Sequence, residues 1–319
     1  MDYRCKTPVL MIFFNRPETF EKVFEKVRKA KPYTLILAQD GARNEHDLVG
    51  IDACRKIAER IDWDCEVIRD FSETNLGCGM RPYTAISNVL KQFESVIILE
   101  DDCIPSDSFF RYCDELLERY QDDDRVAYIS GLNHFETWDC GRSDYFFTRA
   151  GAIWGWATWR NKWERYYDYY VRGVEDPYIR KLYCQQVGNK TVCESRIASL
   201  EKANQSLRNG EKLSYWDTQW GFAEYTQNML AIVPRVNLIH NVGVGAKSTH
   251  ARTMNTEKWT KYRNFVFIPT HELEFPLRHA NFCACDVEYH QLVYKCTRGS
   301  ILKRTVKTVL KILGVRREK

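Results

Sequence analysis

The sequence predicts an α/β fold: a mostly parallel sheet with helices on both faces, followed by a C-terminal helical appendage. Short apolar runs alternate with amphipathic segments over the first hundred residues, a pattern typical of parallel strands joined by right-handed helical crossovers. A chain of 319 residues is long enough to bury a full core. Because no repeat or low-complexity linker divides it, we expect one domain over 1–297, with halves at 1–132 and 133–297, and a tail at 298–319.

Each element follows from a local pattern, and the first helix is the clearest example. Pro17 stands near its start and apolar residues fall on one of its faces. In the alternating region we expect strands at 8–14, 34–38, 65–68 and 96–99 and helices at 17–30, 46–61 and 82–93. Beyond it we expect helices at 107–120, 159–170, 191–209 and 215–229 and strands at 126–130, 145–148 and 231–239.

Composition excludes some classes of protein and favours a cytoplasmic location. Lys and Arg number 47 against 43 Asp and Glu, a balance that does not indicate a nucleic-acid partner. The 12 cysteines form no C-x-x-C pair, so we expect free thiols in a reducing cytosol. The apolar run at 9–14 is too short to span a bilayer or to serve as a signal sequence.

An acidic triplet, Glu100-Asp101-Asp102, follows the strand expected at 96–99. In open α/β sheets, ligands bind at the carboxyl ends of the strands. Adjacent carboxylates repel one another unless a cation lies between them, and a hard divalent ion that bridges to a phosphate is the usual reason to build such a cluster. The alternative is a solvated acidic loop.

Polar residues also follow the other strands of this region. They include Asn15 and Arg16 after the first strand, Asp40 after the second, and Asn75 with Gly77 and Gly79 before the next helix. Glycines allow a backbone to approach a ligand closely, and a helix N-terminus favours an anion. Each residue alone is also explained by turn chemistry. What favours a shared site is that all of them fall on the edge of the sheet that carries the acidic triplet.

Together these segments resemble the GT-A glycosyltransferases. The resemblance is carried by residues 8–17, 39–41, 75–77 and 97–102 and by the pair Phe109-Phe110. The nearest branch is that of N-acetylglucosaminyltransferase I, and the segments are also similar to bacterial family-2-like sugar transferases. The resemblance covers residues 7–135 well, is thinner over 150–250 and fades beyond.

The resemblance implies a transferase that takes a sugar from a nucleotide-diphosphate sugar, with UDP favoured, and passes it to a glycan or lipid-linked glycan in surface polysaccharide synthesis. The first half would bind the donor and the second half the acceptor. By resemblance, Asp40 contacts the base, Asp101 the ribose, and Asp102 ligates Mn²⁺ or Mg²⁺ at the donor diphosphate. Asn15, Arg16, Asn75 and Gly77 are further donor-binding candidates at the same edge.

The catalytic base of the family is an Asp in a W-D-D-W-like segment that begins a helix. Residues 215–220 match it in part, with Thr218 in place of one acid, so Asp217 is the candidate and Glu224 the alternative. Inverting transfer needs a carboxylate that takes a proton from the acceptor hydroxyl, and apolar walls would raise its pKa. The competing explanation for Asp217 is an N-cap of its own helix.

Three further segments stand out. Residues 151–159 interleave three Trp with two Gly, which indicates either a sugar platform or a core-packing turn. In the Gly-rich stretch 240–250, His250 or His240 would meet the metal by resemblance, and Lys247 would neutralise the diphosphate. Residues 301–315 form a basic amphipathic pattern that suits an anionic membrane surface on the inner face of the plasma membrane, or a packing helix.

Two other functions compete with glycosyl transfer. The first is a non-catalytic nucleotide-sugar or carbohydrate-binding relative with the same fold. The second is a metal-dependent nucleotidyltransferase, which would require a Gly-rich, Arg-containing loop directly after the first strand. The sequence Asn15-Arg16-Pro17-Glu18 does not supply that loop.

Overall fold

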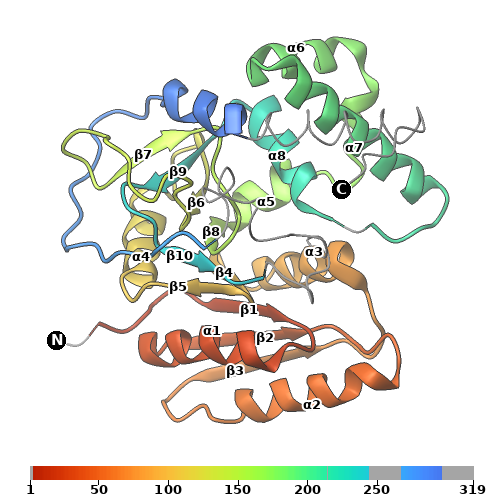
Figure 1. The fold of residues 1–319 in the computed structure, drawn as a ribbon, viewed down its shortest axis with the longest axis vertical. Helices are drawn as coiled ribbons and strands as arrows, with labels where there is room; N and C mark the ends of the chain where they lie inside the picture. Colours follow the sequence, from red (N-terminus) through yellow and green to blue (C-terminus); the bar gives the residue numbers. More distant parts are fainter. Residues whose placement is uncertain (1–2, 214, 244–266, 297–319) are drawn as a thin grey trace, which may run out of the picture.

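The computed structural model describes residues 3–213, 215–243 and 267–296. Within these ranges, strands form one large mixed sheet in the order β3-β2-β1-β4-β8-β6-β9-β7 (Figure 1). Its members are β1 (Val9–Phe13), β2 (Thr34–Gln39), β3 (Glu66–Phe71), β4 (Ser95–Glu100), β6 (Val126–Ser130), β7 (Tyr145–Thr148), β8 (Trp156–Trp159) and β9 (Leu230–Pro234). A separate antiparallel pair is made by β5 (Cys103–Pro105) and β10 (Ile239–Asn241).

The sheet is parallel where the sequence pattern is most regular. β1 pairs in parallel with β2 and β4, and β2 with β3. In the second half, β6 and β9 are parallel, whereas β8 runs antiparallel to both β4 and β6, and β7 antiparallel to β9. The predicted α/β class is therefore confirmed. β8 was not expected, because its four residues belong to the Gly- and Trp-rich segment 151–159, which fits no simple helix or strand period.

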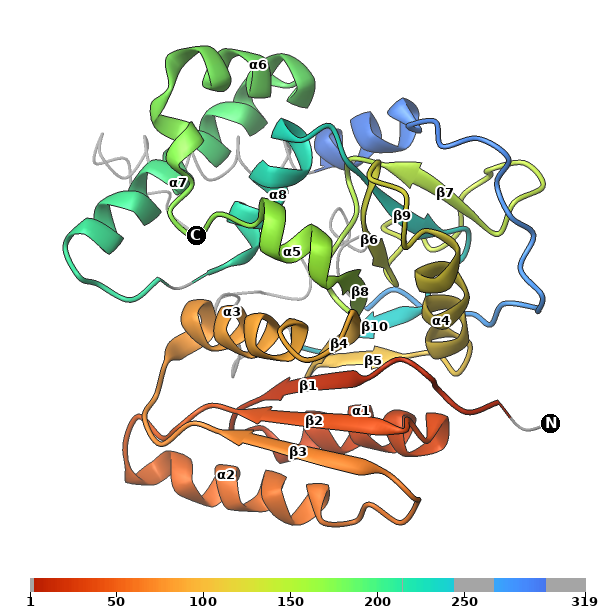
Figure 2. The same ribbon diagram turned by 180° about the vertical axis from the view of Figure 1, so that it is seen from behind.

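The helices of the described residues are α1 (Pro17–Ala30), α2 (Glu45–Ala58), α3 (Gly77–Leu90), α4 (Phe109–Arg119), α5 (Arg160–Tyr166), α6 (Pro177–Val187), α7 (Lys190–Arg208) and α8 (Asp217–Thr226), with a 3₁₀ turn η1 (Arg172–Glu175). Residues 287–296 are also helical. None of these helices is long and apolar enough to cross a membrane. Figure 2 shows α6 and α7 at the end of the molecule opposite α2.

Two hydrophobic clusters lie on the two faces of the sheet, because successive strand residues point to opposite sides. On one face, Val9 and Met11 of β1 pack with residues of α1, α2 and α4. On the other, Leu10 and Ile12 pack with residues of α3, α5 and α8. Helices therefore cover both faces, as predicted.

Some boundaries differ from the sequence prediction. α3 begins at Gly77 rather than at residue 82, and Pro82 lies inside it. The stretch 231–239 divides into β9 and the start of β10, and α6 was not expected. The early start of α3 depends on a contact from a distant residue: Asp40 accepts hydrogen bonds from the backbone N–H groups of Leu76 and Gly77. A local pattern does not reveal such a contact.

Candidate active site

The acidic triplet lies at the carboxyl end of β4, and Arg16, just beyond the neighbouring β1, reaches it. The Arg16 guanidinium bonds to Asp101, and its Nη2 lies 2.9 Å from Asp102 Oδ2. Asp101 is buried and also accepts a hydrogen bond from the Phe14 N–H at 3.3 Å. The structure thus brings together three residues that the sequence assigned to one edge.

Acidic groups outnumber basic ones at this edge, where Glu100, Asp101 and Asp102 lie with Arg16. Burial raises the pKa of Glu100, and the charges of Asp102, Asp101 and Asp217 raise it further. Burial also raises the pKa of Asp101, while Arg16 acts in the opposite direction. Because the acids disfavour one another's ionised forms, an additional cation here would be stabilised.

A divalent ion fits this edge if the donor supplies part of its coordination. The described residues contain no group of three or more His, Cys, Asp or Glu that could hold a metal ion. Mg²⁺ in nucleotide enzymes is usually held by one or two carboxylates together with substrate phosphates and water. Asp102 is partly exposed, and a Cβ at Gly243 would lie only 2.0 Å from its Oδ2. Any larger residue at position 243 would therefore collide with the Asp102 carboxylate, and glycine avoids this collision.

Asp40 shapes the turn that precedes α3. Its carboxylate accepts hydrogen bonds from the N–H groups of Leu76 at 2.8 Å and Gly77 at 2.9 Å, and from Asn75 Nδ2 at 3.0 Å. Gly77 has a positive φ of 82° and open space at its Cβ position. Contact of Asp40 with a nucleobase stays a prediction. The structure adds that Asp40 joins Asn75 and Gly77 into one unit at the start of α3.

Gly79 allows the backbone of α3 to approach another segment of the protein closely, rather than a ligand. A Cβ there would lie 2.3 Å from the carbonyl oxygen of Leu213, in the segment that leads into α8. The first turn of α3 therefore packs directly on the backbone of the second half of the chain. The expectation that this glycine serves ligand approach is corrected on that point.

Asn15 is held by a residue that the sequence analysis missed. Its Nδ2 donates a hydrogen bond to Asp47 Oδ1 at 2.7 Å, and Asp47 also accepts bonds from the backbone and guanidinium of Arg43. These bonds, the guanidinium first, lower the pKa of Asp47 to about 2. Asp47 thus fixes the positions of Asn15 and Arg43 beside the edge that carries the acidic triplet.

Asp217 lies where the acidic edge meets the second half of the chain. Burial raises the pKa of the Cys78 thiol at the start of α3, and the charges of Glu100, Asp40 and Asp217 raise it further. These three acids come from strand ends and a helix that are far apart in sequence, and the folded chain gathers them around one helix terminus.

Asp217 also lines a cavity of about 350 Å³. α8 presents Asp217, Trp220 and Glu224 to it, and residues 151–154 form part of the wall. On a helix, positions 217, 220 and 224 fall on one face. The two catalytic candidates therefore share one cavity with the Gly- and Trp-rich segment.

The three Trp of that segment have different surroundings. Trp156 and Trp159 are buried in β8, which agrees with the core-packing explanation for these two residues. Trp154 is half-buried and lines the cavity. An aromatic face suits a sugar ring, so only Trp154 keeps the platform interpretation.

Glu224 is more deeply buried than Asp217. It is 3% exposed, its Oε1 has no hydrogen-bond partner among the described residues, and burial raises its pKa well above the usual range against the lowering effect of Arg196 and Arg149. A carboxyl group that holds its proton is a poor general base. This difference favours Asp217 for proton removal.

Other candidates lie elsewhere. Lys247, His250 and the tail at 298–319 fall outside the described residues. His240 belongs to β10, and its Nδ1 lies 3.0 Å from the carbonyl oxygen of Ile268.

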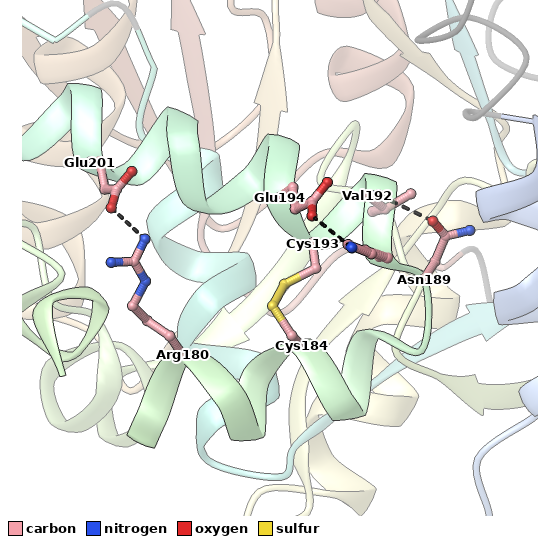
Figure 3. Close-up of a disulfide and its surroundings, with 8 residues drawn as sticks. Arg180, Cys184, Asn189, Val192, Cys193, Glu194 and Glu201 are labelled. Atoms are coloured by element: carbon pink, nitrogen blue, oxygen red, sulfur yellow. Dashed lines mark hydrogen bonds and ion pairs between the residues drawn. A yellow bond between two sulfur atoms is a disulfide. The ribbon is translucent and has the colours of Figure 1, made fainter. Parts of the chain in front are cut away.

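A disulfide joins α6 to α7 beside the cavity. Cys184 and Cys193 are bonded (Figure 3), so the prediction of free thiols is wrong for this pair. The other ten cysteines form no disulfide. Cys184 follows the cavity residue Tyr183, and Cys193 lies one helical turn before Arg196, also a cavity residue. No spacing in the sequence singled out these two cysteines among twelve.

Comparisons with known proteins give weak likenesses only. No protein-family model and no curated protein matches the sequence. Among solved structures, galactosyltransferase LgtC in complex with donor and acceptor sugar analogues is 9% identical with a TM-score of 0.36, over 89% of this chain and 95% of that one. A UDP-glucose pyrophosphorylase complexed with UDP-glucose is 8% identical with a TM-score of 0.34, over 74% and 92%. Likenesses at this level identify neither a family nor a function.

Proposed function

We propose that the protein is a nucleotide-sugar-dependent glycosyltransferase that inverts the configuration of the sugar it transfers. The observation that carries this proposal is the position of Asp217. Its charge acts on Glu100 and Cys78 at the donor-side edge, and its side chain lines the cavity. One carboxylate thus lies between a site suited to a diphosphate and a cavity suited to an acceptor.

The chain's own residues then have distinct tasks. Asp217 takes the proton of the acceptor hydroxyl that attacks the anomeric carbon. Trp154 offers an aromatic face to a sugar ring, and the walls of the cavity limit access of water to the donor. Loss of the proton to Asp217 leaves the hydroxyl oxygen free to bond to carbon as the nucleoside diphosphate departs.

On the donor side, Arg16 holds Asp101 for the ribose, and the turn built by Asp40, Asn75 and Gly77 directs the N-terminus of α3 to the nucleotide. Lys247 is proposed to meet the diphosphate. Asp102, with His250 as a further candidate, would hold Mn²⁺ or Mg²⁺, and such an ion supplies Lewis-acid stabilisation to the leaving diphosphate.

The proposal is tested by donor hydrolysis, which needs no known acceptor. The full chain is incubated with a panel of UDP-sugars and GDP- and dTDP-sugars, with Mn²⁺, Mg²⁺ or a chelator, and nucleoside diphosphate release is measured. We expect slow release with one donor, dependent on the ion, and loss of ion-dependent donor binding in Asp102→Asn.

The outcomes separate the competing functions. Ion-dependent donor binding without any release favours the non-catalytic relative. Release of pyrophosphate from a nucleoside triphosphate and a sugar 1-phosphate favours a nucleotidyltransferase. Unchanged ion-dependent affinity in a folded Asp102→Asn variant contradicts the metal assignment.

We further propose that the acceptor is a glycan or lipid-linked glycan used in surface polysaccharide synthesis, and that the protein works in the cytoplasm on the inner face of the plasma membrane. The ten cysteines without a disulfide agree with a reducing compartment. The Cys184–Cys193 bond argues in the other direction, so the oxidation state of this pair in the cell is a direct check on the location.

A further inference from the structure

Two arginines line the cavity on the side away from the donor edge. Arg149 follows β7 and Arg196 belongs to α7, and both side chains are in the cavity wall with Glu224. Asp217 and Glu224 are seven residues apart on α8, which separates them by about 10 Å along the helix axis. The arginines, which both act on Glu224, are therefore remote from the proposed base.

Both arginines have unused hydrogen-bonding capacity. Arg149 bonds to Gln186 Oε1 and lies 3.4 Å from Asn228 Oδ1, but its buried Nε has no partner within the described part of the chain. Arg196 lies over the rings of Tyr225 and Tyr294, at 5.5 Å and 5.0 Å from their centroids. Its buried Nη1 also has no hydrogen-bond partner there. A buried guanidinium N–H without an acceptor is costly.

The groups that face these arginines do not neutralise them. Glu224 is the carboxyl group on which both act; burial raises its pKa, and its Oε1 accepts no hydrogen bond from either arginine. His290 packs beside them, and burial together with Arg196 and Arg149 lowers its pKa to about 4, so its imidazole is neutral at pH 7. Burial raises the pKa values of Tyr183 and Tyr225, so these two side chains are neutral as well.

We propose that Arg149 and Arg196 bind the acidic group, a carboxylate or a phosphate, of the acceptor sugar. Guanidinium groups match both anions geometrically, with two parallel hydrogen bonds each. The inference rests on the proposed function and narrows its acceptor to acidic glycans. With the acidic group at the arginines, a hydroxyl on the same or the neighbouring sugar unit lies toward Asp217, so the arginines would set which hydroxyl reacts.

The test measures binding of small sugars to the full chain without any donor. D-glucuronate, D-glucose 6-phosphate and D-glucose are titrated separately and followed by ligand-observed NMR. We expect at least one acidic sugar to bind about tenfold or more tightly than glucose, as expected for charge-assisted hydrogen bonds. The two acidic probes distinguish a carboxylate from a phosphate as the preferred group.

Substitutions localise the effect. Arg149→Gln and Arg196→Gln should each reduce the preference for the acidic sugar about fivefold or more, and Arg149→Lys and Arg196→Lys should retain part of it. Arg235→Gln is the matched control, because Arg235 also has a buried Nε without a partner among the described residues but is not in the cavity wall. It should leave the preference unchanged.

Equal affinity for glucose and for both acids, or an acid preference that survives both Gln substitutions, would overturn the proposal. If Arg196→Gln fails to fold, Arg149→Gln and Arg196→Lys still decide it. Donor hydrolysis does not enter this measurement. Acid-selective binding without donor hydrolysis would therefore contradict the proposed transferase and leave the anion site standing. Donor hydrolysis without acid selectivity would contradict the anion site and leave the transferase standing.

Discussion

The two carboxyl groups of α8 differ in their surroundings, and the difference decides which can act as a base. Glu224 is enclosed, with a pKa raised by burial. Asp217 stands at the first position of the helix and influences groups on the donor side. A base must be ionised before it can accept a proton. Of the two candidates, the exposed Asp217 is therefore the better placed for the proposed proton transfer.

For this reason Asp217→Asn should lower kcat about 10²-fold or more with donor affinity near that of the wild type. Glu224→Gln should retain most of the activity, because an amide resembles the protonated acid in size and polarity. Steady-state kinetics with donor titrations of both variants would decide the matter. An active Asp217→Asn variant beside an inactive Glu224→Gln variant would move the base to Glu224.

At the donor edge, Asp47 offers a prediction with a defined pH dependence. Its folded pKa of about 2 lies below the usual Asp value, so its ionised form stabilises the fold above about pH 4. That contribution is lost as pH falls from about 4 toward 2. Asp47→Asn should thus cost about 1–3 kcal/mol of unfolding free energy at pH 7.

Denaturant unfolding of both proteins from pH 7 down to pH 3 would test this. The difference between them should shrink as the pH falls below 4. A difference that stays constant over that range would mean that the charge of Asp47 contributes nothing. Asp47→Asn should also weaken donor binding, since the amide offers Asn15 and Arg43 one acceptor oxygen in place of two.

At the scale of elements, the start of α3 joins the two halves of the molecule. Asp40 of the first half fixes its first turn, and Gly79 lies on the Leu213 backbone of the second half. The contact requires a residue without a Cβ at position 79. This explains a glycine near the start of a helix, where it otherwise weakens the element.

Gly79→Ala should therefore destabilise the protein by about 1–3 kcal/mol, because the new methyl group overpacks the contact. Gly221→Ala in α8 is the matched control, because nothing lies within 4 Å of its Cβ position. We expect this variant to raise the free energy of unfolding by about 0.5–1 kcal/mol, since alanine favours a helix over glycine. Thermal unfolding of both variants is the measurement. Equal stability of the two alanine variants would contradict the close packing at Gly79.

Sequence patterns predicted those elements whose form depends on local periodicity. α1 has the predicted bounds, as do β6 and β7: α1 shows a clear apolar period, and the two strands are short apolar runs bounded by turn residues. The start of α3 and the path of β8 were not predictable in this way. The first depends on Asp40, and the second lies in the Gly- and Trp-rich segment 151–159, which has no clear helix or strand period.

At the scale of the whole molecule, the candidate site also contains residues that the sequence could predict and residues that it could not. The shared edge of Arg16 and the acids after β4 could be predicted, because parallel strands end at one edge of a sheet. Arg149, Arg196 and Asp47 could not, since their importance lies in what faces them in space. The same holds for Cys184 and Cys193, whose bond depends on how α6 packs on α7.

The C-terminal region allows a final prediction about the whole chain. The helical residues 287–296 bury Tyr289 and Tyr294 in the core, so a truncation must spare them. Removal of residues 300–319 leaves every described residue in place. The removed segment carries Lys303, Lys307 and Lys311 on one side of its amphipathic pattern, and each basic group near an anionic surface contributes about 1 kcal/mol, screened by salt.

The truncated protein should therefore sediment less with anionic liposomes than the full chain, and binding of the full chain should fall as salt rises. Donor hydrolysis should stay unchanged. Replacement of the three lysines by glutamine in the full chain is the matched control, since it removes charge and keeps the apolar face. It should lower binding to anionic liposomes and leave any weak binding to neutral ones. Two outcomes would contradict the membrane proposal: no binding of the full chain to anionic liposomes at low salt, or unfolding of the domain on truncation. In either case the segment is a packing element.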